Sequence, residues 1–137
     1  MTSLIGGPFS QRTIERRLAQ EMSHLQEHGY QYWPIFHLDG DRHMGCAGFR
    51  PYRDDGRVCE FGIHLRPEFH GHGIASEASG AIIDYGFGAL GLETVVAGHN
   101  PSNVASRNLL MKHGFLYVRD EFYPPTCLMH PFYMLER

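Results

Sequence analysis

The spacing of apolar positions in the N-terminal part of the chain predicts an amphipathic helix. Between residues 10 and 28, apolar side chains recur every three or four residues among charged ones, at Ile14, Leu18, Met22 and Leu25. This spacing places them along one side of a helix. Ser10 is a suitable N-cap and Gly29 ends the pattern, so both helix boundaries are expected there.

The following part of the chain changes to a strand-like pattern. Three segments rich in aromatic or β-branched residues span residues 30–38, 43–50 and 57–65. They are separated by Asp39-Gly40-Asp41 and Asp54-Asp55-Gly56, whose composition is typical of tight turns. We therefore expect three antiparallel strands joined by short turns.

Helical and strand-like segments alternate in the remainder. Residues 73–89 return to helical spacing, 93–99 read as a buried strand, and 103–113 read as another helix. Two strands, 115–122 and 127–135, complete the chain around Pro124-Pro125. Strand 57–65, helix 73–89 and strand 93–99 form a βαβ unit, so the predicted fold class is α/β (α+β), with a mixed, mostly antiparallel sheet and flanking helices.

Composition limits the possible classes of protein. A length of 137 residues with 42% hydrophobic content predicts one globular domain. The formal charge of −3 gives no basic field for nucleic acid, whereas a cationic amine substrate would be tolerated. Cys46, Cys59 and Cys127 are odd in number and have no CxxC spacing, which is typical of reduced thiols in a cytoplasmic protein. There is no secretory pattern at the start and no apolar run of roughly 18 residues, so we expect a cytoplasmic protein without a membrane partner.

The stretch His70-Gly71-His72-Gly73 joins the first strand of the βαβ unit to its helix. The N-terminus of a helix leaves backbone N–H groups without partners, and the helix dipole adds positive potential there. Glycines at 71 and 73 permit positive φ and leave room for close approach, so the consecutive N–H groups from about Gly71 to Ala75 could converge on one diphosphate. A tight turn without a ligand is the alternative.

Two other interpretations of this turn are weaker. A dinucleotide site requires GxGxxG, which residues 70–75 lack, and does not follow three antiparallel strands. A histidine-metal enzyme would use His70 and His72, with His64 and His99 nearby, but no cysteine or carboxylate stands at a recognised ligand spacing. We therefore expect no metal.

Two motifs in this chain resemble those of the GNAT superfamily of N-acetyltransferases. The first runs from Val58 through Pro67 to Ala78, and its Gly73 and Ala75 match the last two fixed positions of the family's Gln/Arg-x-x-Gly-x-Gly/Ala turn. His70 departs from the family, which has Gln, Arg or, in the ribosomal-protein-alanine acetyltransferase-like branch, often Trp. The second motif, Asn103 to Arg107 followed by Lys112-His113-Gly114-Phe115, is similar to that branch's Asn-x-x-Ser-Arg and Lys-x-Gly-Phe.

The resemblance implies an enzyme that moves an acetyl group from acetyl-CoA to a primary amine by direct attack in a ternary complex. The fold would contain a splayed parallel strand pair, with the pantetheine arm of CoA pairing near Ile63 and Leu65. The resemblance places the pyrophosphate on the backbone N–H groups of residues 70–75 and implies a hydrogen bond from Asn103 to the pantetheine arm. The cofactor-binding residues expected are therefore Ile63, Leu65, His70, Gly71, His72, Gly73, Ile74, Ala75, Asn103, Ser106 and Arg107.

The reaction needs a group that accepts a proton from the amine. Strand alternation puts Glu60 and His64 on one face of strand 57–65, and Glu60 matches the glutamate that the family frequently uses through water. The two residues lie about 13 Å apart in a straight strand, so they are alternatives or the two ends of a water chain.

The reaction also needs a proton donor for the departing thiolate. The family's usual tyrosine is absent, since positions 109–111 are Leu, Leu and Met. Ser106 matches the serine to which the branch assigns this role, and Tyr123 is a second candidate. An ordinary helix-start serine and a packed strand-end tyrosine are the structural alternatives.

The family normally begins with a strand and a helix ahead of the segment assigned to residues 10–28. We expect residues 1–137 to form a single domain without them, with Met1 to Phe9 as a remnant of the connection. Segment 30–38 would then be an exposed edge, which predicts a homodimer formed through that edge. The acceptor would be a protein N-terminus or a small amine; an acyl-CoA sensor with little or no activity is the alternative function.

Overall fold

A computed structural model describes residues 9–53 and 55–137. The elements follow the order expected from the sequence: α1 (Gln11–His28), β1 (Tyr32–Phe36), β2 (His43–Pro51), β3 (Val58–Leu65), α2 (Ile74–Gly88), β4 (Thr94–Gly98), α3 (Val104–Lys112), β5 (Leu116–Tyr123) and β6 (Leu128–Glu136). Pro67–Phe69 adds a short 3₁₀ helix that the sequence pattern did not predict. The predicted remnant at Met1 to Phe9 lies, apart from Phe9, outside the described residues.

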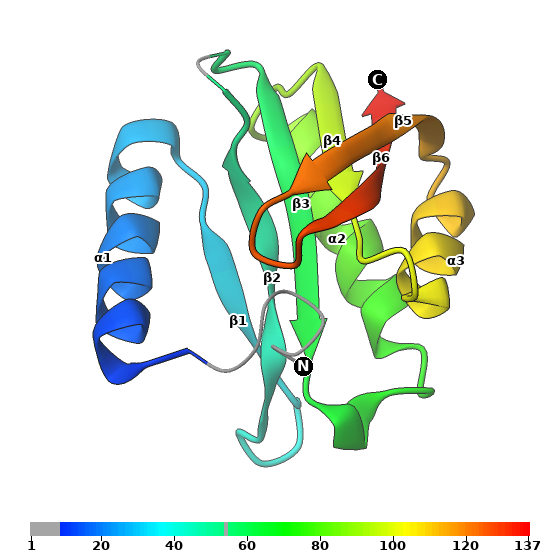
Figure 1. The fold of residues 1–137 in the computed structure, drawn as a ribbon. Helices are drawn as coiled ribbons and strands as arrows, with labels where there is room; N and C mark the ends of the chain where they lie inside the picture. Colours follow the sequence, from blue (N-terminus) through cyan, green and yellow to red (C-terminus); the bar gives the residue numbers. More distant parts are fainter. Residues whose placement is uncertain (1–8, 54) are drawn as a thin grey trace.

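Within the described residues, six strands form one mixed sheet in the order β1-β2-β3-β4-β6-β5. The β3–β4 pair is parallel, and the other neighbouring pairs are antiparallel. The meander, the βαβ unit and the mixed sheet are therefore confirmed. Figure 1 shows α1 standing beside the first strands, while α2 and α3 lie on the other side of the molecule.

The main core lies between the sheet and α2 with α3. It contains Phe49, Cys59 and Phe61 from the strands, Ile83 from α2 and Leu110 from α3. Cys59 and Phe61 are both buried and stand two residues apart on β3, so their side chains point to the same face of this strand and that face belongs to the core. The other face of β3 points toward α1.

Helix α1 forms where its pattern predicted, with Ser10 Oγ accepting a hydrogen bond from the Thr13 N–H and Gly29 in the left-handed conformation at its end. Its apolar side, however, does not enter the core. Four residues of that side are exposed to solvent: Ile14, Leu18, Met22 and Leu25. Polar residues face the sheet instead, so the space between α1 and the sheet is a hydrophilic one.

Strand β1 lies at one edge of the sheet within the described part of the chain. It runs from Tyr32 to Phe36, shorter than the predicted segment 30–38, and Tyr30 before it is buried in the core. Along an edge strand, every second backbone N–H group points away from the sheet and has no strand partner. At Tyr32 this N–H donates to Glu21 Oε2 at 2.9 Å, and Pro34 has none, so few donors are left for another strand.

None of the described helices is long and apolar enough to span a membrane.

Candidate active site

The parallel strands β3 and β4 are paired over only part of their length. Val58, Cys59 and Glu60 pair with Thr94, Val95 and Val96, and the pairing stops there, although β3 continues to Leu65. Residues 61–65 remain paired with β2 on their other side. The backbone groups of this part of β3 that face β4 therefore have no strand partner, which is the splayed geometry expected from the sequence.

A turn rich in glycine follows the open end of β3 and begins α2. Gly71 and Gly73 have φ values of +78° and +79°, and a Cβ atom at either position would meet nothing within 4 Å. Gly73 is the N-cap of α2 and provides no side-chain cap, and the first N–H bonded within the helix is that of Glu77, to the Gly73 carbonyl oxygen. The open space and the free N–H groups fit a phosphate group.

The phosphate site begins at Gly71, as the turn geometry predicted, and the range of residues 70–75 implied by the resemblance loses its first donor. The N–H of His70 donates to the Pro67 carbonyl oxygen at 3.1 Å, because the short 3₁₀ helix uses it, so the free donors begin at Gly71. The His70 ring also has a partner: Nε2 lies 3.0 Å from the Leu65 carbonyl oxygen. His72 is exposed.

A small apolar cluster packs between the end of β3 and the start of α2, on either side of the turn at residues 70–73. Met44, Leu65 and Phe69 are buried together, with Ile63 and Ile74 packed against them. The cluster joins the end of β3 to the start of α2 and so fixes the position of the intervening turn. The side chains of Ile63 and Leu65 thus pack in this cluster, while their backbone lies in the part of β3 that is not paired with β4.

The second motif lies at the start of α3. Asn103 Oδ1 accepts a hydrogen bond from the Ser106 N–H at 3.1 Å, so this side chain caps the helix and its amide NH₂ group stays available. Ser106 is half-buried and Arg107 is exposed. Arg107 also lines a cavity of about 420 Å³ with His99 and Tyr133. Helices α2 and α3 meet where Ser76 Oγ lies 3.4 Å from His113 Nε2.

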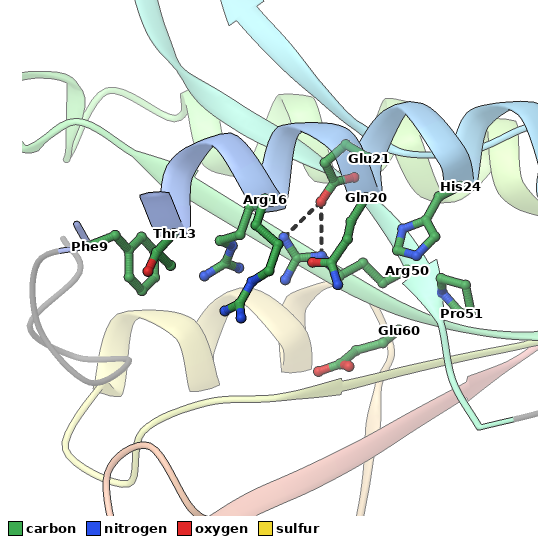
Figure 2. A pocket seen from close by; sticks show the side chains of 10 residues that line it. Phe9, Thr13, Arg16, Gln20, Glu21, His24, Arg50, Pro51 and Glu60 are labelled. Atoms are coloured by element: carbon green, nitrogen blue, oxygen red, sulfur yellow. Dashed lines mark hydrogen bonds and ion pairs between the residues drawn. The ribbon is translucent and has the colours of Figure 1, made fainter. Parts of the chain in front are cut away.

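The face of β3 that turns toward α1 carries Glu60, Gly62 and His64. In register with them on β2 lie Arg50 opposite Glu60 and Cys46 opposite His64. Glu60 lines a cavity of about 430 Å³ between α1 and the sheet, and Figure 2 shows its side chain on the sheet side of this cavity, across from α1. Both predicted proton acceptors are therefore on the polar face of the sheet, four residues apart on one strand.

The environments of these two groups differ. The walls of the cavity raise the pKa of Glu60 by desolvation although water reaches its side chain; Arg50 opposes the rise and Glu121 adds to it. Burial, together with the positive charges of Arg50 and Arg17, lowers the pKa of His64 to about 4. His64 is therefore a neutral imidazole near pH 7, and Glu60 is a carboxylate of raised basicity.

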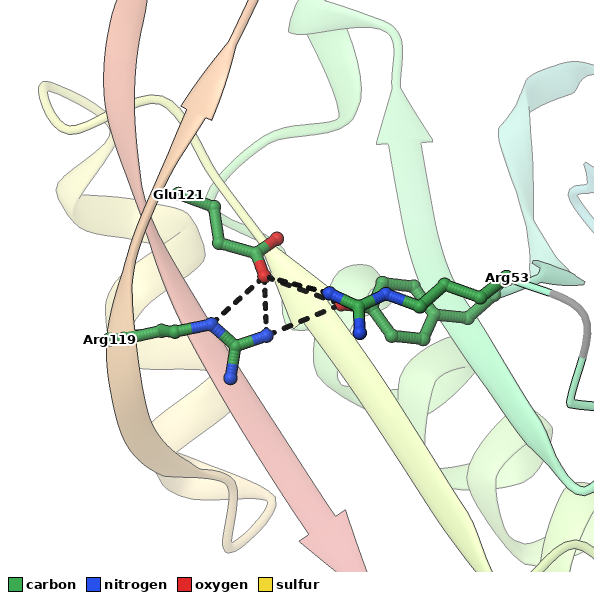
Figure 3. Close-up of polar contacts among 4 residues, drawn as sticks. Arg53, Arg119 and Glu121 are labelled. Carbon is green, nitrogen blue, oxygen red and sulfur yellow. Dashed lines mark hydrogen bonds and ion pairs between the residues drawn. The ribbon is translucent and has the colours of Figure 1, made fainter.

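The Glu121 carboxylate is held by a polar cluster at the far side of the site. Arg119 Nε donates to Glu121 Oε1 at 3.0 Å, the Tyr52 hydroxyl donates to the same oxygen at 3.3 Å, and Arg53 Nη2 lies 3.9 Å away (Figure 3). This cluster connects the segment after β2 with β5. It keeps Glu121 in position as a negative charge beside Glu60.

Tyr32 is a component of the site that the sequence analysis missed. Its side chain reaches across β2, and a Cβ atom at Gly62 would lie 1.9 Å from the Tyr32 hydroxyl oxygen. The Arg50 guanidinium lies 4.2 Å above its ring, and the His64 ring centroid is 6.0 Å away. The hydroxyl has no hydrogen-bond partner among the described residues. The only sequence signal was the glycine between Glu60 and His64, which makes room for the ring.

Tyr123 lies at the end of β5, next to the turn before β6. Its ring centroid is 4.7 Å from that of His130 on the neighbouring strand, and the side chain is exposed on its other side. It is also near α1, because its hydroxyl influences the pKa of Arg17. Among the described residues no three histidine, cysteine or carboxylate side chains converge as metal ligands.

Comparison with solved structures identifies the class of fold. The chain superposes on the acetyltransferase from Agrobacterium tumefaciens str. C58 with a TM-score of 0.83, covering 99% of this chain and 78% of that one at 20% identity. A ribosomal-protein-S5-alanine acetyltransferase from Vibrio fischeri gives 0.81, with 98% and 79% covered, also at 20% identity. This chain therefore has the acetyltransferase fold, with the splayed strand pair at its centre.

The family follows from sequence. The model of the acetyltransferase (GNAT) domain matches residues 1–116, so this chain belongs to the GNAT family. It is 37% identical over 83 residues to the uncharacterized N-acetyltransferase YoaA of Bacillus subtilis (strain 168), covering 61% of this chain and 47% of that protein. It is 31% identical over 109 residues to the uncharacterized N-acetyltransferase p20 of Bacillus licheniformis, covering 79% and 61%. The chain thus spans about half the length of the curated relatives it matches.

Proposed function

We propose that this protein transfers an acetyl group from acetyl-CoA to a primary amine. The observation that carries the proposal is the continuous path from the unpaired backbone of β3 residues 61–65 to the free N–H groups at the start of α2. A linear ligand with amide groups at one end and a pyrophosphate at the other matches this path. Membership of the GNAT family supports the same ligand.

The proposed position of CoA uses the backbone more than side chains. Its pyrophosphate accepts hydrogen bonds from the N–H groups of residues 71–75, and its pantetheine arm pairs with β3 near Ile63 and Leu65. The amide NH₂ of Asn103 is free to donate to the pantetheine arm, because only Oδ1 is used in capping α3. Arg107, exposed on α3, is the candidate for the 3′-phosphate.

In the proposed reaction the amine nitrogen forms a bond to the thioester carbon and the carbon–sulfur bond breaks. Glu60 accepts the proton that the nitrogen loses, through a water molecule, because its raised pKa makes it the more basic of the two groups on this face. His64, with its pKa of about 4, is neutral and serves as a hydrogen-bonding partner of that water chain. The products are the acetylated amine and the free thiol of CoA.

The proton for the thiolate comes from a hydroxyl group. Ser106 is the first candidate, since it is half-buried at the start of α3. Tyr32 is the second, because its hydroxyl has no partner among the described residues and rests over Gly62 on the polar face of β3. Tyr123 is the weakest, because its ring is packed against His130.

Matched variants test the function. Glu60→Gln should lower kcat/KM for amine acetylation about 100-fold or more while leaving the affinity for CoA unchanged. Glu136→Gln, at an exposed position at the end of β6, is the control and should behave as wild type. CoA binding without acetyl transfer to any amine in a broad panel would instead support a role as an acyl-CoA sensor. Wild-type activity in Glu60→Gln would remove Glu60 from the mechanism.

We also propose that the chain forms a homodimer through the sheet edge at residues 30–38. Strand β1 is at the sheet edge, but Glu21 and Pro34 leave it few free N–H donors. Light scattering at micromolar concentration tests the prediction, and a monomeric mass would count against it.

A further inference from the structure

The cavity between α1 and the sheet has more positive than negative groups. It measures about 430 Å³, within the size range of small-molecule sites, and Figure 2 shows side chains of α1 directed toward Arg50 and Glu60 of the sheet. Its charged lining residues are Arg16, Arg17, Glu21, Arg50 and Glu60. Three cationic groups therefore meet two carboxylates.

One of the three arginines already has its counterion. Arg50 donates through Nη2 and Nε to Glu21 Oε1 at 2.8 and 3.0 Å, and the second oxygen of that carboxylate accepts the Tyr32 N–H. Both oxygens of the Glu21 carboxylate thus accept hydrogen bonds, and the charge of Glu21 offsets part of the lowering of the Arg17 pKa. Two arginines remain, and Glu60 is the only other carboxylate among the described residues of the lining.

Arg16 and Arg17 have no ion-pair partner in the described part of the chain. Arg17 is half-buried, and desolvation and the neighbouring charge of Arg50 lower its pKa. Its guanidinium lies 4.5 Å from the centre of the Phe9 ring, which orients it without using any of its N–H donors. A partly desolvated guanidinium whose N–H donors have no partner in residues 9–53 and 55–137, beside a second arginine, is a site for an anion.

From this arrangement we infer that the amine acceptor carries a carboxylate, and that Arg17 with Arg16 binds this group while the amine faces Glu60. The inference rests on the proposed acetyl transfer and adds the chemical class of the acceptor. A free amino acid and the N-terminal residue of a peptide with an acidic side chain share this chemistry. A polyamine does not, because a second cationic group would face the two unpaired arginines.

The first experiment compares acceptors that differ only in the anion. Acetyl transfer is measured for a set of amino acids, for the same amino acids as carboxamides, for short peptides starting with Asp or Glu, and for spermidine. We expect kcat/KM at least tenfold higher for acceptors with a carboxylate than for their neutral counterparts. A preference for the free amino acids or for the acidic peptides distinguishes the two sources. Equal use of carboxylate and carboxamide, or preference for spermidine, would overturn the inference while leaving acetyl transfer intact.

The second experiment uses variants of α1. Arg17→Gln should raise KM for the carboxylate acceptor about 10- to 100-fold, with little change in kcat or in the use of the carboxamide. Arg12→Gln, an exposed arginine of the same helix outside the cavity lining, is the matched control. Equal effects of Arg17→Gln on both acceptors would contradict binding of the anion by this residue.

A binding measurement decides the question without turnover. Calorimetry on CoA-saturated protein with an N-acetylated amino acid and with its carboxamide should give tighter binding of the carboxylate, and Arg17→Gln should abolish the difference. Equal affinities would overturn the inference. A protein that binds the carboxylate selectively but transfers no acetyl group would refute the proposed function alone.

Discussion

Replacing Gly62 with alanine should destabilise the protein through a collision with one identified side chain. The backbone of Gly62 has an ordinary extended conformation, so alanine introduces no backbone strain. Its Cβ, however, would lie 1.9 Å from the Tyr32 hydroxyl oxygen and 2.7 Å from Cζ of the same ring. The ring cannot shift freely, because the Arg50 guanidinium lies 4.2 Å from it and Arg50 is held by Glu21.

The expected loss is about 1–3 kcal/mol of unfolding free energy, the usual range for overpacking. If the collision with Tyr32 is the cause, Tyr32→Leu should relieve it. The double variant Gly62→Ala/Tyr32→Leu should therefore be more stable than the sum of the single effects predicts, with a coupling of about 0.5–3 kcal/mol. Urea unfolding of the wild type, both single variants and the double variant measures this coupling.

Gly48 provides a contrasting control. A Cβ there would lie 1.9 Å from the backbone carbonyl oxygen of Gln31, which no side-chain change removes. Tyr32→Leu should consequently give no rescue of Gly48→Ala. Additive effects of Gly62→Ala and Tyr32→Leu would refute the placement of Tyr32 over β3, and with it the candidate role of its hydroxyl.

Three further predictions concern single groups of the site. Gly73→Val should abolish CoA binding, because φ at this position is +79° and the new side chain would fill the space for the phosphate. His72→Ala should weaken CoA binding only slightly, and the reverse ranking of the two affinities in calorimetry would contradict phosphate binding by the backbone of this turn. The pKa of His64 is lowered from 6.5 to about 4 in the folded protein, so as the pH falls the unfolded chain takes up a proton on His64 before the folded protein does. The free energy of unfolding therefore decreases between pH 6.5 and 4, and His64 has no effect on it above pH 7. At pH 5 the loss of unfolding free energy caused by His64 is at most about 2 kcal/mol. Urea unfolding at pH 7 and pH 5 should therefore show a smaller loss of stability in His64→Gln than in the wild type. An equal loss would exclude His64 as the source. Glu21→Gln should cost about 2 kcal/mol by leaving Arg50 without its counterion, whereas the exposed Glu15→Gln should change stability little; equal effects would show that the Arg50–Glu21 pair contributes nothing.

Much of the fold was predictable because its signals are local. The helix of residues 10–28 was expected from a cap, a spacing and a terminal glycine, and α1 runs from Gln11 to His28. Strand 57–65 was expected from composition and alternation, and β3 runs from Val58 to Leu65. Such signals depend on neighbouring residues, and so they survive without knowledge of the rest of the chain. The short helix at Pro67–Phe69 was missed because three residues give no period.

The candidate site was predictable only in part. The glycine turn and the common face of Glu60 and His64 follow from strand and helix geometry, and both are present in the structure. Tyr32 could not be assigned, because its position over Gly62 depends on the pairing of three strands. The hydroxyl donor for the thiolate stays a prediction.

The sequence by itself determined the order of elements, the glycine turn and the motifs of the GNAT family, because periodicity, caps and turn residues act over a few positions. Only the tertiary structure decided which side of α1 faces the sheet: its apolar side is exposed, and its arginines line the cavity. It also decided that Glu21 pairs with Arg50, 29 residues away, while Arg17 forms no ion pair with any residue that the structure describes. A formal charge of −3 for the whole chain gave no sign of this local positive site, because electrostatic pairing depends on distance in space and on burial, neither of which a count of charges contains.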